Sequence, residues 1–178
     1  MRIKDSYNYA SPQYSRLYEP SRAVSKAYGE GNKWLDQLKE YVYIVQGMPN
    51  LSRLIHENAH KQLEYLDEFG DVLHQRHLMQ FYPTVEELAL EDEVSDVDGV
   101  FNLLIRTFDH IQEALMSFRN AANQANLLPL ALRTEELMAK NSNHDTVFLE
   151  LWARWDTDGG SKTSFDGLCE EYLEGKED

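Results

Sequence analysis

The sequence offers no basis for disulfides, membrane spans or a secretory leader. It has one cysteine, Cys169, which excludes an internal disulfide framework and agrees with a reducing compartment. No apolar run approaches the ~20 residues needed to cross a bilayer. The first residues, MRIKDSYNYASPQYSRLYEP, lack an apolar run after their charges, unlike a secretory signal. We therefore expect a cytoplasmic protein without a membrane span.

Positive charge is also scarce. The chain has 17 Lys and Arg against 31 Asp and Glu, which gives a net charge of −14. Binding to DNA phosphates depends on clustered basic residues, and the first 25 residues offer only Arg2, Lys4, Arg16 and Arg22. DNA binding is therefore not expected, whereas an acidic excess favours solubility and attracts cations.

Proline and glycine are few, five and nine residues, and they fall where helices would have to stop. Apolar residues at helical spacing predict a first helix that ends at Gly47-Met48-Pro49. A second helix, capped by Asn50, is predicted to reach about Gln80. The buried stripe predicted for this second helix is Leu51, Leu54, Ile55, Ala59, Leu63, Leu66, Phe69 and Leu73.

The next segment is predicted to be a long, acidic crossover. Thr84 and Glu87 have the spacing of a capping box, so a short helix is expected to begin there. Ser95 is the predicted cap of a third long helix, and Pro129 fits the first turn of a fourth. No strand alternation and no solenoid repeat is visible in the sequence.

A chain of 178 residues is long enough for one compact domain with a sizeable core. We expect an extended N-terminal arm at residues 1–20, a bundle at residues 21–156 and a C-terminal tail at residues 157–178. Two long helices, a long crossover and two further helices are typical of a bundle with one crossing connection. The predicted fold is therefore all-α, a ferritin-like four-helix bundle whose crossover carries a short helix.

The second helix carries the densest set of metal-capable side chains. They recur at spacings of four, seven, four and three residues, along one edge of the helix: His56, His60, Asp67, Asp71 and His74. Imidazole and carboxylate together suit iron, manganese or zinc, and Glu57-x-x-His60 has the spacing of carboxylate-bridged di-iron bundles. A solvated polar face with histidines at a subunit contact is the alternative interpretation of this pattern.

Two other motifs suggest different chemistry. His56-Glu57-Asn58-Ala59-His60 matches the H-E-x-x-H pattern of zinc proteases, but no third ligand and no strand for a substrate accompany it. Residues 156–167 begin like an EF-hand calcium loop at Asp156 and Asp158. Gly167 then replaces the bidentate glutamate, so the segment is interpreted as a turn-rich linker rather than a calcium site.

Several features together resemble the Dps-type mini-ferritins, a family of hollow dodecamers that oxidise and store iron. The first helix ends in Val45-Gln46-Gly47, and His56 opens the second helix. Asp71 lies fifteen residues further on, within D-V-L-H-Q-R, which is similar to the family's D-x-x-A-E-R. Tyr82-Pro83-Thr84 precedes the acidic crossover. The similarity covers about residues 30–157.

The resemblance implies a ferroxidase site between two subunits. In the family, one subunit contributes two histidines, and the other contributes an aspartate and a glutamate. His56 matches one histidine and Asp71 matches the aspartate. The second histidine falls at Val42 or Ile44, which are apolar, and the glutamate falls at Gln75, which is neutral.

The resemblance also places Tyr65 where an aromatic residue flanks the family's site. Two alternative functions follow from this partial match of the ligands. In the first, His60, Asp67 or His74 completes the site. The protein is then an iron-binding ferroxidase that stores or detoxifies iron, or another divalent metal, under oxidative stress as a homododecamer. In the second, the site has decayed, and the shell is a structural or partner-binding assembly.

Overall fold

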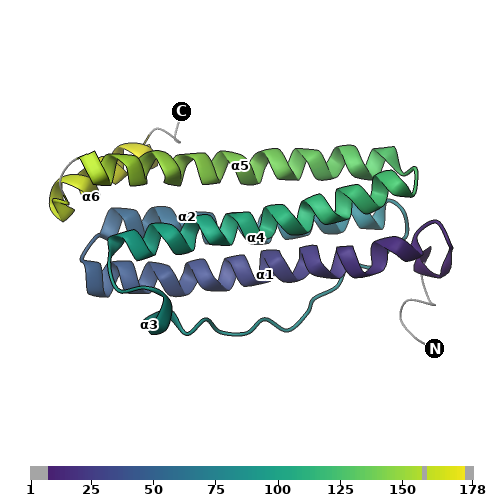
Figure 1. Ribbon diagram of the computed structural model, residues 1–178, viewed down its shortest axis with the longest axis horizontal. Helices are drawn as coiled ribbons and strands as arrows, with labels where there is room; N and C mark the ends of the chain where they lie inside the picture. The colour runs from purple at the N-terminus through teal and green to yellow at the C-terminus, as the bar shows by residue number, and fades with distance from the viewer. Residues whose placement is uncertain (1–7, 158–159, 175–178) are drawn as a thin grey trace.

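A computed structural model of the chain describes residues 8–157 and 160–174. Every regular element among these residues is helical, as predicted (Figure 1). The long helices are α1 (Tyr18–Tyr41), α2 (Pro49–His74), α4 (Val97–Gln124) and α5 (Leu128–Thr157). The shorter elements are η2 (Asn8–Ala10), η3 (Ser15–Leu17), the π-helical η4 (Val42–Gln46), α3 (Leu90–Glu93) and α6 (Lys162–Glu174).

The long helices lie side by side as a helical bundle. α1 packs along α2 and α4, and α5 packs along α4 and α2. Short connections join α1 to α2 and α4 to α5, whereas residues 75–96 travel back along the bundle before α4 begins (Figure 1). α2 and α4 consequently run in the same direction. The predicted long crossover with a short helix is therefore present.

The interior is built from the apolar stripes of the long helices. In one half, the Phe69 and Phe118 rings meet edge to face at 5.0 Å, and in the other Phe108 stacks on Phe148 at 5.7 Å. The stripe predicted for α2 is buried except for Leu63, which is 42% exposed. Leu63 lies seven residues after His56, so it shares the outward edge of the histidines rather than the core.

α2 ends at His74, earlier than the predicted Gln80. His77 adopts a positive φ of 54°, and the backbone N–H of Leu78 reaches back to the Leu73 carbonyl at 3.0 Å, which closes the last turn. The Gln80 side chain folds over the helix and donates to the Leu66 carbonyl at 2.7 Å. Gly70 leaves the space for it, because a Cβ there would lie 2.1 Å from the Gln80 amide oxygen.

The short crossover helix was expected at Thr84, but α3 begins only at Leu90. The preceding residues, 84–89, form no regular element, and α1 side chains bond to their backbone groups. Gln37 donates to the Leu88 carbonyl at 3.3 Å and accepts from the Leu88 N–H at 3.1 Å. Lys33 donates to the Val85 carbonyl at 3.3 Å. These bonds replace the intrahelical bonds that a helix would have supplied.

Two of the residues predicted to cap helices are not the caps in the structure. Asp96, not Ser95, caps α4 and accepts from the Gly99 N–H at 2.8 Å. α2 starts at Pro49, so Asn50 is its second residue and not its cap. The predicted stop at Gly47 is confirmed, since Gly47 ends η4 with a φ of 69°. Pro129 lies in the first turn of α5, as predicted.

The segment interpreted as a tail contains α6, which packs against α2. Phe165, Cys169 and Leu173 insert into the apolar cluster at this end of the bundle. Asp166 accepts the first backbone N–H groups of α2, from Asn50 at 3.0 Å and Leu51 at 2.9 Å. α6 therefore supplies the cap that α2 lacks locally.

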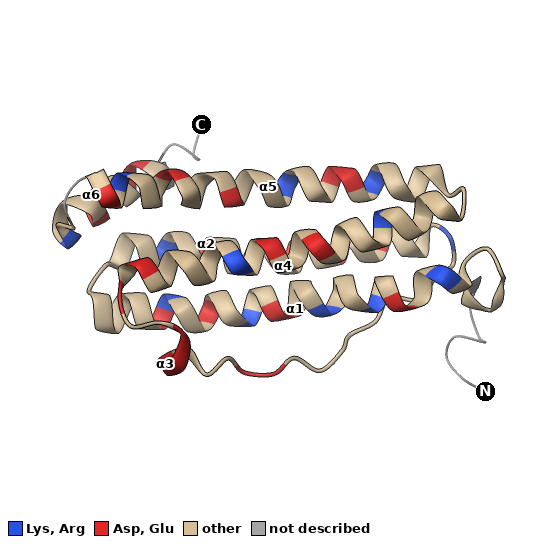
Figure 2. Cartoon of the chain, in the orientation of Figure 1, with Lys and Arg blue, Asp and Glu red and all other residues tan. Residues whose placement is uncertain are grey.

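The described part of the segment expected as an N-terminal arm contains two 3-10 turns at the opposite end of the bundle, and its last residues, 18–20, already belong to α1. Tyr9 is buried there, and its hydroxyl donates to the Met79 carbonyl at 3.1 Å. Acidic and basic residues both occur along every long helix, and α3 is almost entirely acidic (Figure 2). No helix within residues 8–157 and 160–174 combines the length and apolarity of a membrane span.

Candidate metal centre

The five predicted ligands all lie on the outward edge of α2. His56 is half-buried, and His60, Asp67, Asp71 and His74 are exposed. An α-helix rises ~1.5 Å per residue, so His56 and Asp71 stand about 22 Å apart along the axis. One subunit therefore cannot bring these two residues to the same ion.

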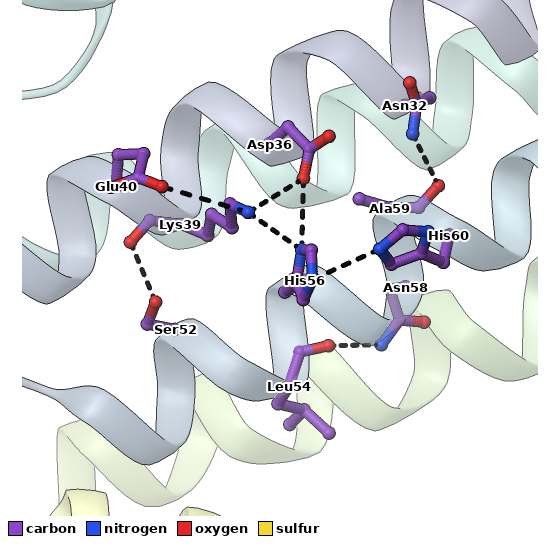
Figure 3. Close-up of polar contacts among 10 residues, drawn as sticks. All are labelled: Asn32, Asp36, Lys39, Glu40, Ser52, Leu54, His56, Asn58, Ala59 and His60. Atoms are coloured by element: carbon purple, nitrogen blue, oxygen red, sulfur yellow. Dashed lines mark hydrogen bonds and ion pairs between the residues drawn. The ribbon is translucent and has the colours of Figure 1, made fainter.

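The two histidines that begin this edge are in direct contact. Their Nε2 atoms are 3.1 Å apart, and their rings meet edge to face with centroids separated by 4.4 Å (Figure 3). Spacing by four residues on one helix face produces this approach. Asp36, from the neighbouring turn of α1, places a carboxylate oxygen 3.2 Å from Nδ1 of His56. The result is a row Asp36–His56–His60 across α1 and α2.

Lys39 also approaches His56. Its Nζ lies 2.9 Å from the same Nδ1, 3.4 Å from Asp36 and 3.8 Å from Glu40 (Figure 3). A single imidazole nitrogen cannot serve both neighbours, because Nδ1 must carry a proton to donate to Asp36 and must lack it to accept from Lys39. The tautomer of His56 therefore depends on which of the two contacts prevails.

The Asp36 contact is the one that suits metal binding. When Nδ1–H of His56 donates to Asp36, Nε2 presents a lone pair toward His60. Metal-bound histidines commonly donate their other N–H to a carboxylate in this way. Two imidazole nitrogens at about 2.0–2.1 Å from one ion stand roughly 3 Å apart in adjacent coordination positions, close to the spacing seen here. Lys39 keeps Asp36 and Glu40 as partners when it leaves Nδ1.

The histidine pair is an incomplete site. Within the described residues, no group of three or more His, Cys, Asp or Glu side chains is arranged to hold one ion. Val42, one position given by the resemblance for a second histidine, is fully buried, and Ile44, the other, is 72% exposed. Neither side chain can ligate a metal, so an ion at the histidine pair would need further ligands from beyond the described residues of one chain.

The carboxylate end of the edge has a different environment. Asp71 and Gln75 line a surface hollow of about 200 Å³ between α2 and α5, together with Arg133 and Glu136. Arg133 is paired with Glu136 at 2.6 Å. Asp71 is exposed, and the neutral Gln75 adds no charge beside it.

Tyr65 does not flank this edge. It is buried, and its hydroxyl lies 2.7 Å from Nε2 of His144 on α5. The pKa of Tyr65 is raised, chiefly because burial disfavours the phenolate. The aromatic that the resemblance placed beside the metal thus belongs to the bundle interior.

The structure also shows the surroundings of the two other motifs, the H-E-x-x-H pattern and the calcium-like segment. Glu57 of the H-E-x-x-H pattern pairs with Arg53 at 3.4 Å, and no strand borders the motif among the described residues. For the calcium-like segment, Asp156 lies in the last turn of α5, and Asp158 falls outside the described residues. From Lys162 onward the segment is helical, so residues 162–167 do not form the second half of a calcium loop.

Sequence reasoning missed Asp36 and Lys39. They are ordinary charged positions on α1, and only the packing of α1 against α2 identifies them as partners of His56. Comparisons with known proteins do not add to the assignment, because no family model and no curated protein matches the chain.

Proposed function

We propose that this protein is a Dps-like, ferritin-like bundle that binds iron, or another divalent metal, at sites shared by two copies of the chain. The single observation that carries the proposal is the row Asp36–His56–His60, in which the Asp36 carboxylate lies 3.2 Å from Nδ1 of the half-buried His56 and the exposed His60 lies 3.1 Å from its Nε2. The long crossover between parallel helices α2 and α4 supports the ferritin-like assignment of the bundle.

The order of residues along α2 favours completion by a second copy. The midpoint between His56 and Asp71, near Leu63 and Glu64, is also the midpoint between His60 and Asp67. If two α2 edges pack antiparallel about a two-fold axis through this midpoint, each histidine faces an aspartate of the other copy. Leu63, exposed at the centre of the edge, would be covered by this contact.

The combined ligands would suit ferrous iron and its oxidation. Imidazole nitrogens bind the ferrous ion, and carboxylate oxygens from Asp71 and Asp67 stabilise the more highly charged ferric product. With hydrogen peroxide as oxidant, two ferrous ions each lose one electron, and one peroxide is reduced to two hydroxide ions. Asp36 would hold the proton on Nδ1 of His56 and keep its Nε2 available as a ligand.

Subunit mixing tests the shared site directly. Purified protein receives ferrous iron without oxygen, bound metal is counted per subunit, and ferric absorbance is followed after peroxide is added. His56→Ala and Asp71→Ala should each abolish uptake, whereas Asp92→Ala, an exposed carboxylate on α3, should not. When the two inactive variants are unfolded and refolded together, about a quarter of the wild-type sites should return, because one site of each mixed dimer is intact.

The second candidate function is a ferritin-like shell without metal chemistry, acting as a structural or partner-binding assembly. The specific observation in its favour is the Lys39 ammonium at Nδ1 of His56, since a cation at the imidazole opposes binding of another. Intact oligomers that take up no metal would decide for this function. We also propose a homododecamer, measured by light scattering, and a cytoplasmic location, in keeping with the single cysteine.

A further inference from the structure

The middle of the bundle contains polar groups that the metal centre does not use. Side-chain contacts between the long helices show that their central turns lie side by side at the same position along the bundle axis. Tyr28 on α1 and Tyr65 on α2 have ring centroids 6.4 Å apart, and Tyr65 bonds to His144 on α5. The His144 ring in turn lies over Phe108 on α4, with centroids 6.4 Å apart. All four helices therefore meet at this layer.

Three side-chain oxygen atoms on α1, α2 and α5 are buried without a hydrogen-bond partner in the protein. They are the Tyr28 hydroxyl, Gln62 Oε1 and Asn141 Oδ1. The three residues are 0%, 0% and 1% exposed. Ser25 Oγ and Asn58 Oδ1, one turn away on α1 and α2, are in the same condition. Buried polar atoms are almost always hydrogen-bonded, so these oxygens call for a partner that is not part of the protein.

The chemistry of the atoms identifies the partner. The side-chain amide nitrogens of Gln62 and Asn141 already have partners in the protein. Gln62 donates to the Asn58 carbonyl at 3.2 Å, and Asn141 donates to the Phe108 carbonyl at 2.9 Å. Their oxygens can only accept, while a hydroxyl can donate once and accept. A neutral molecule with two donors and two acceptors matches this set. Water fits, and ordered water occurs at such positions on the order of once per 27 residues.

We propose that the bundle has an internal water-binding site at mid-length, formed by Tyr28, Gln62 and Asn141. Water there donates to the two amide oxygens and exchanges hydrogen bonds with the Tyr28 hydroxyl. Burial raises the pKa of Tyr28, so that its hydroxyl keeps its proton and remains a donor. The site links α1, α2 and α5 through one solvent cluster, which disfavours sliding of one helix against another.

Removal of one hydroxyl tests the site with little change in shape. Long-lived internal water is counted by oxygen-17 magnetic relaxation dispersion of the solvent, and melting temperature is measured on the same samples. Tyr28→Phe should lose at least one long-lived water and should not raise the melting temperature. Tyr9→Phe is the matched control, because the Tyr9 hydroxyl is also buried but already bonds to Ser21 and Met79 within the protein. The control should keep the wild-type water count.

Gln62→Met provides a second measurement that does not depend on Tyr28. It replaces the amide by an apolar chain of similar length, and it should also reduce the number of long-lived waters. A wild-type water count in both Tyr28→Phe and Gln62→Met would overturn the proposal. So would a higher melting temperature in either variant with no water lost, because that result indicates a dry site in which the unpaired oxygen was destabilising.

Discussion

The contact between Asp166 of α6 and the start of α2 makes a quantitative prediction about stability. Asp166 is 7% exposed, and its carboxylate accepts the backbone N–H groups of Asn50 and Leu51 at 3.0 and 2.9 Å. Loss of an N-cap acceptor costs about 0.5–2 kcal/mol. Loss of a negative charge at a helix N-terminus costs a further ~0.3–1 kcal/mol. We expect Asp166→Ala to lower the free energy of unfolding by about 2 kcal/mol.

For a chain of this size, about 2 kcal/mol corresponds to a fall of roughly 4–8 °C in melting temperature. Urea denaturation followed by circular dichroism gives the free energy, and a thermal scan gives the midpoint. Glu171→Ala is the matched control, because Glu171 lies on the same helix but is exposed. The control should stay within ~0.5 kcal/mol of the wild type. Asp166→Asn, which keeps an acceptor but removes the charge, should fall between the two.

Equal stability of Asp166→Ala and Glu171→Ala would refute the reasoning. That result would mean that water replaces the carboxylate at the α2 N-terminus at no cost, and that α6 is held by its apolar residues alone. A loss much larger than predicted, with reduced helix content, would instead mean that Asp166 is needed for α6 to fold.

Further outcomes are expected for Cys169, Lys39 and Leu63. Burial raises the pKa of the Cys169 thiol to about 12, so a thiol reagent at pH 8 should react only with unfolded protein. Because the unfolded thiol ionises first, this group should lower stability as the pH rises from about 9 toward 12 in a urea titration. Lys39→Gln should tighten metal binding about threefold to tenfold at low salt, measured by calorimetry, because it removes a cation beside His56. Leu63→Arg should weaken the proposed α2 contact and reduce the oligomer mass in light scattering, whereas unchanged mass would place the contact elsewhere.

Several features that depend on residues close together in the chain were predicted correctly, although the caps at Asn50 and Ser95 and the helix start at Thr84 were not. The stop at Gly47, the first-turn proline of α5 and the single edge of α2 all follow from local pattern and spacing. The end of α2 was predicted too late because the chain closes the helix with a positive φ at His77, a non-glycine residue that the sequence pattern does not mark as a stop, and the residues after it then fold back over the helix. Gln80 folds back on Gly70 and the Leu66 carbonyl, and no helical pattern records that contact. α6 was not predicted as a helix. Its packing depends on contacts with the start of α2, and the Asn50–Asp166 hydrogen bond there joins residues 116 positions apart in the sequence.

The candidate site, too, was predicted where it depends on local spacing and missed where it depends on the packing of two helices. Spacing alone places His56 and His60 together, because residues four apart on a helix are neighbours. Asp36 and Lys39 reach His56 only through the packing of α1 on α2, and they compete for one nitrogen atom. In our proposal this competition matters for function: bonding to Asp36 would leave Nε2 of His56 available as a ligand, whereas bonding to Lys39 would make His56 part of a surface network. The aspartates at the far end of α2 favour the first outcome in an assembled pair, since a second copy would bring negative charge to the histidines and draw Lys39 away from Nδ1.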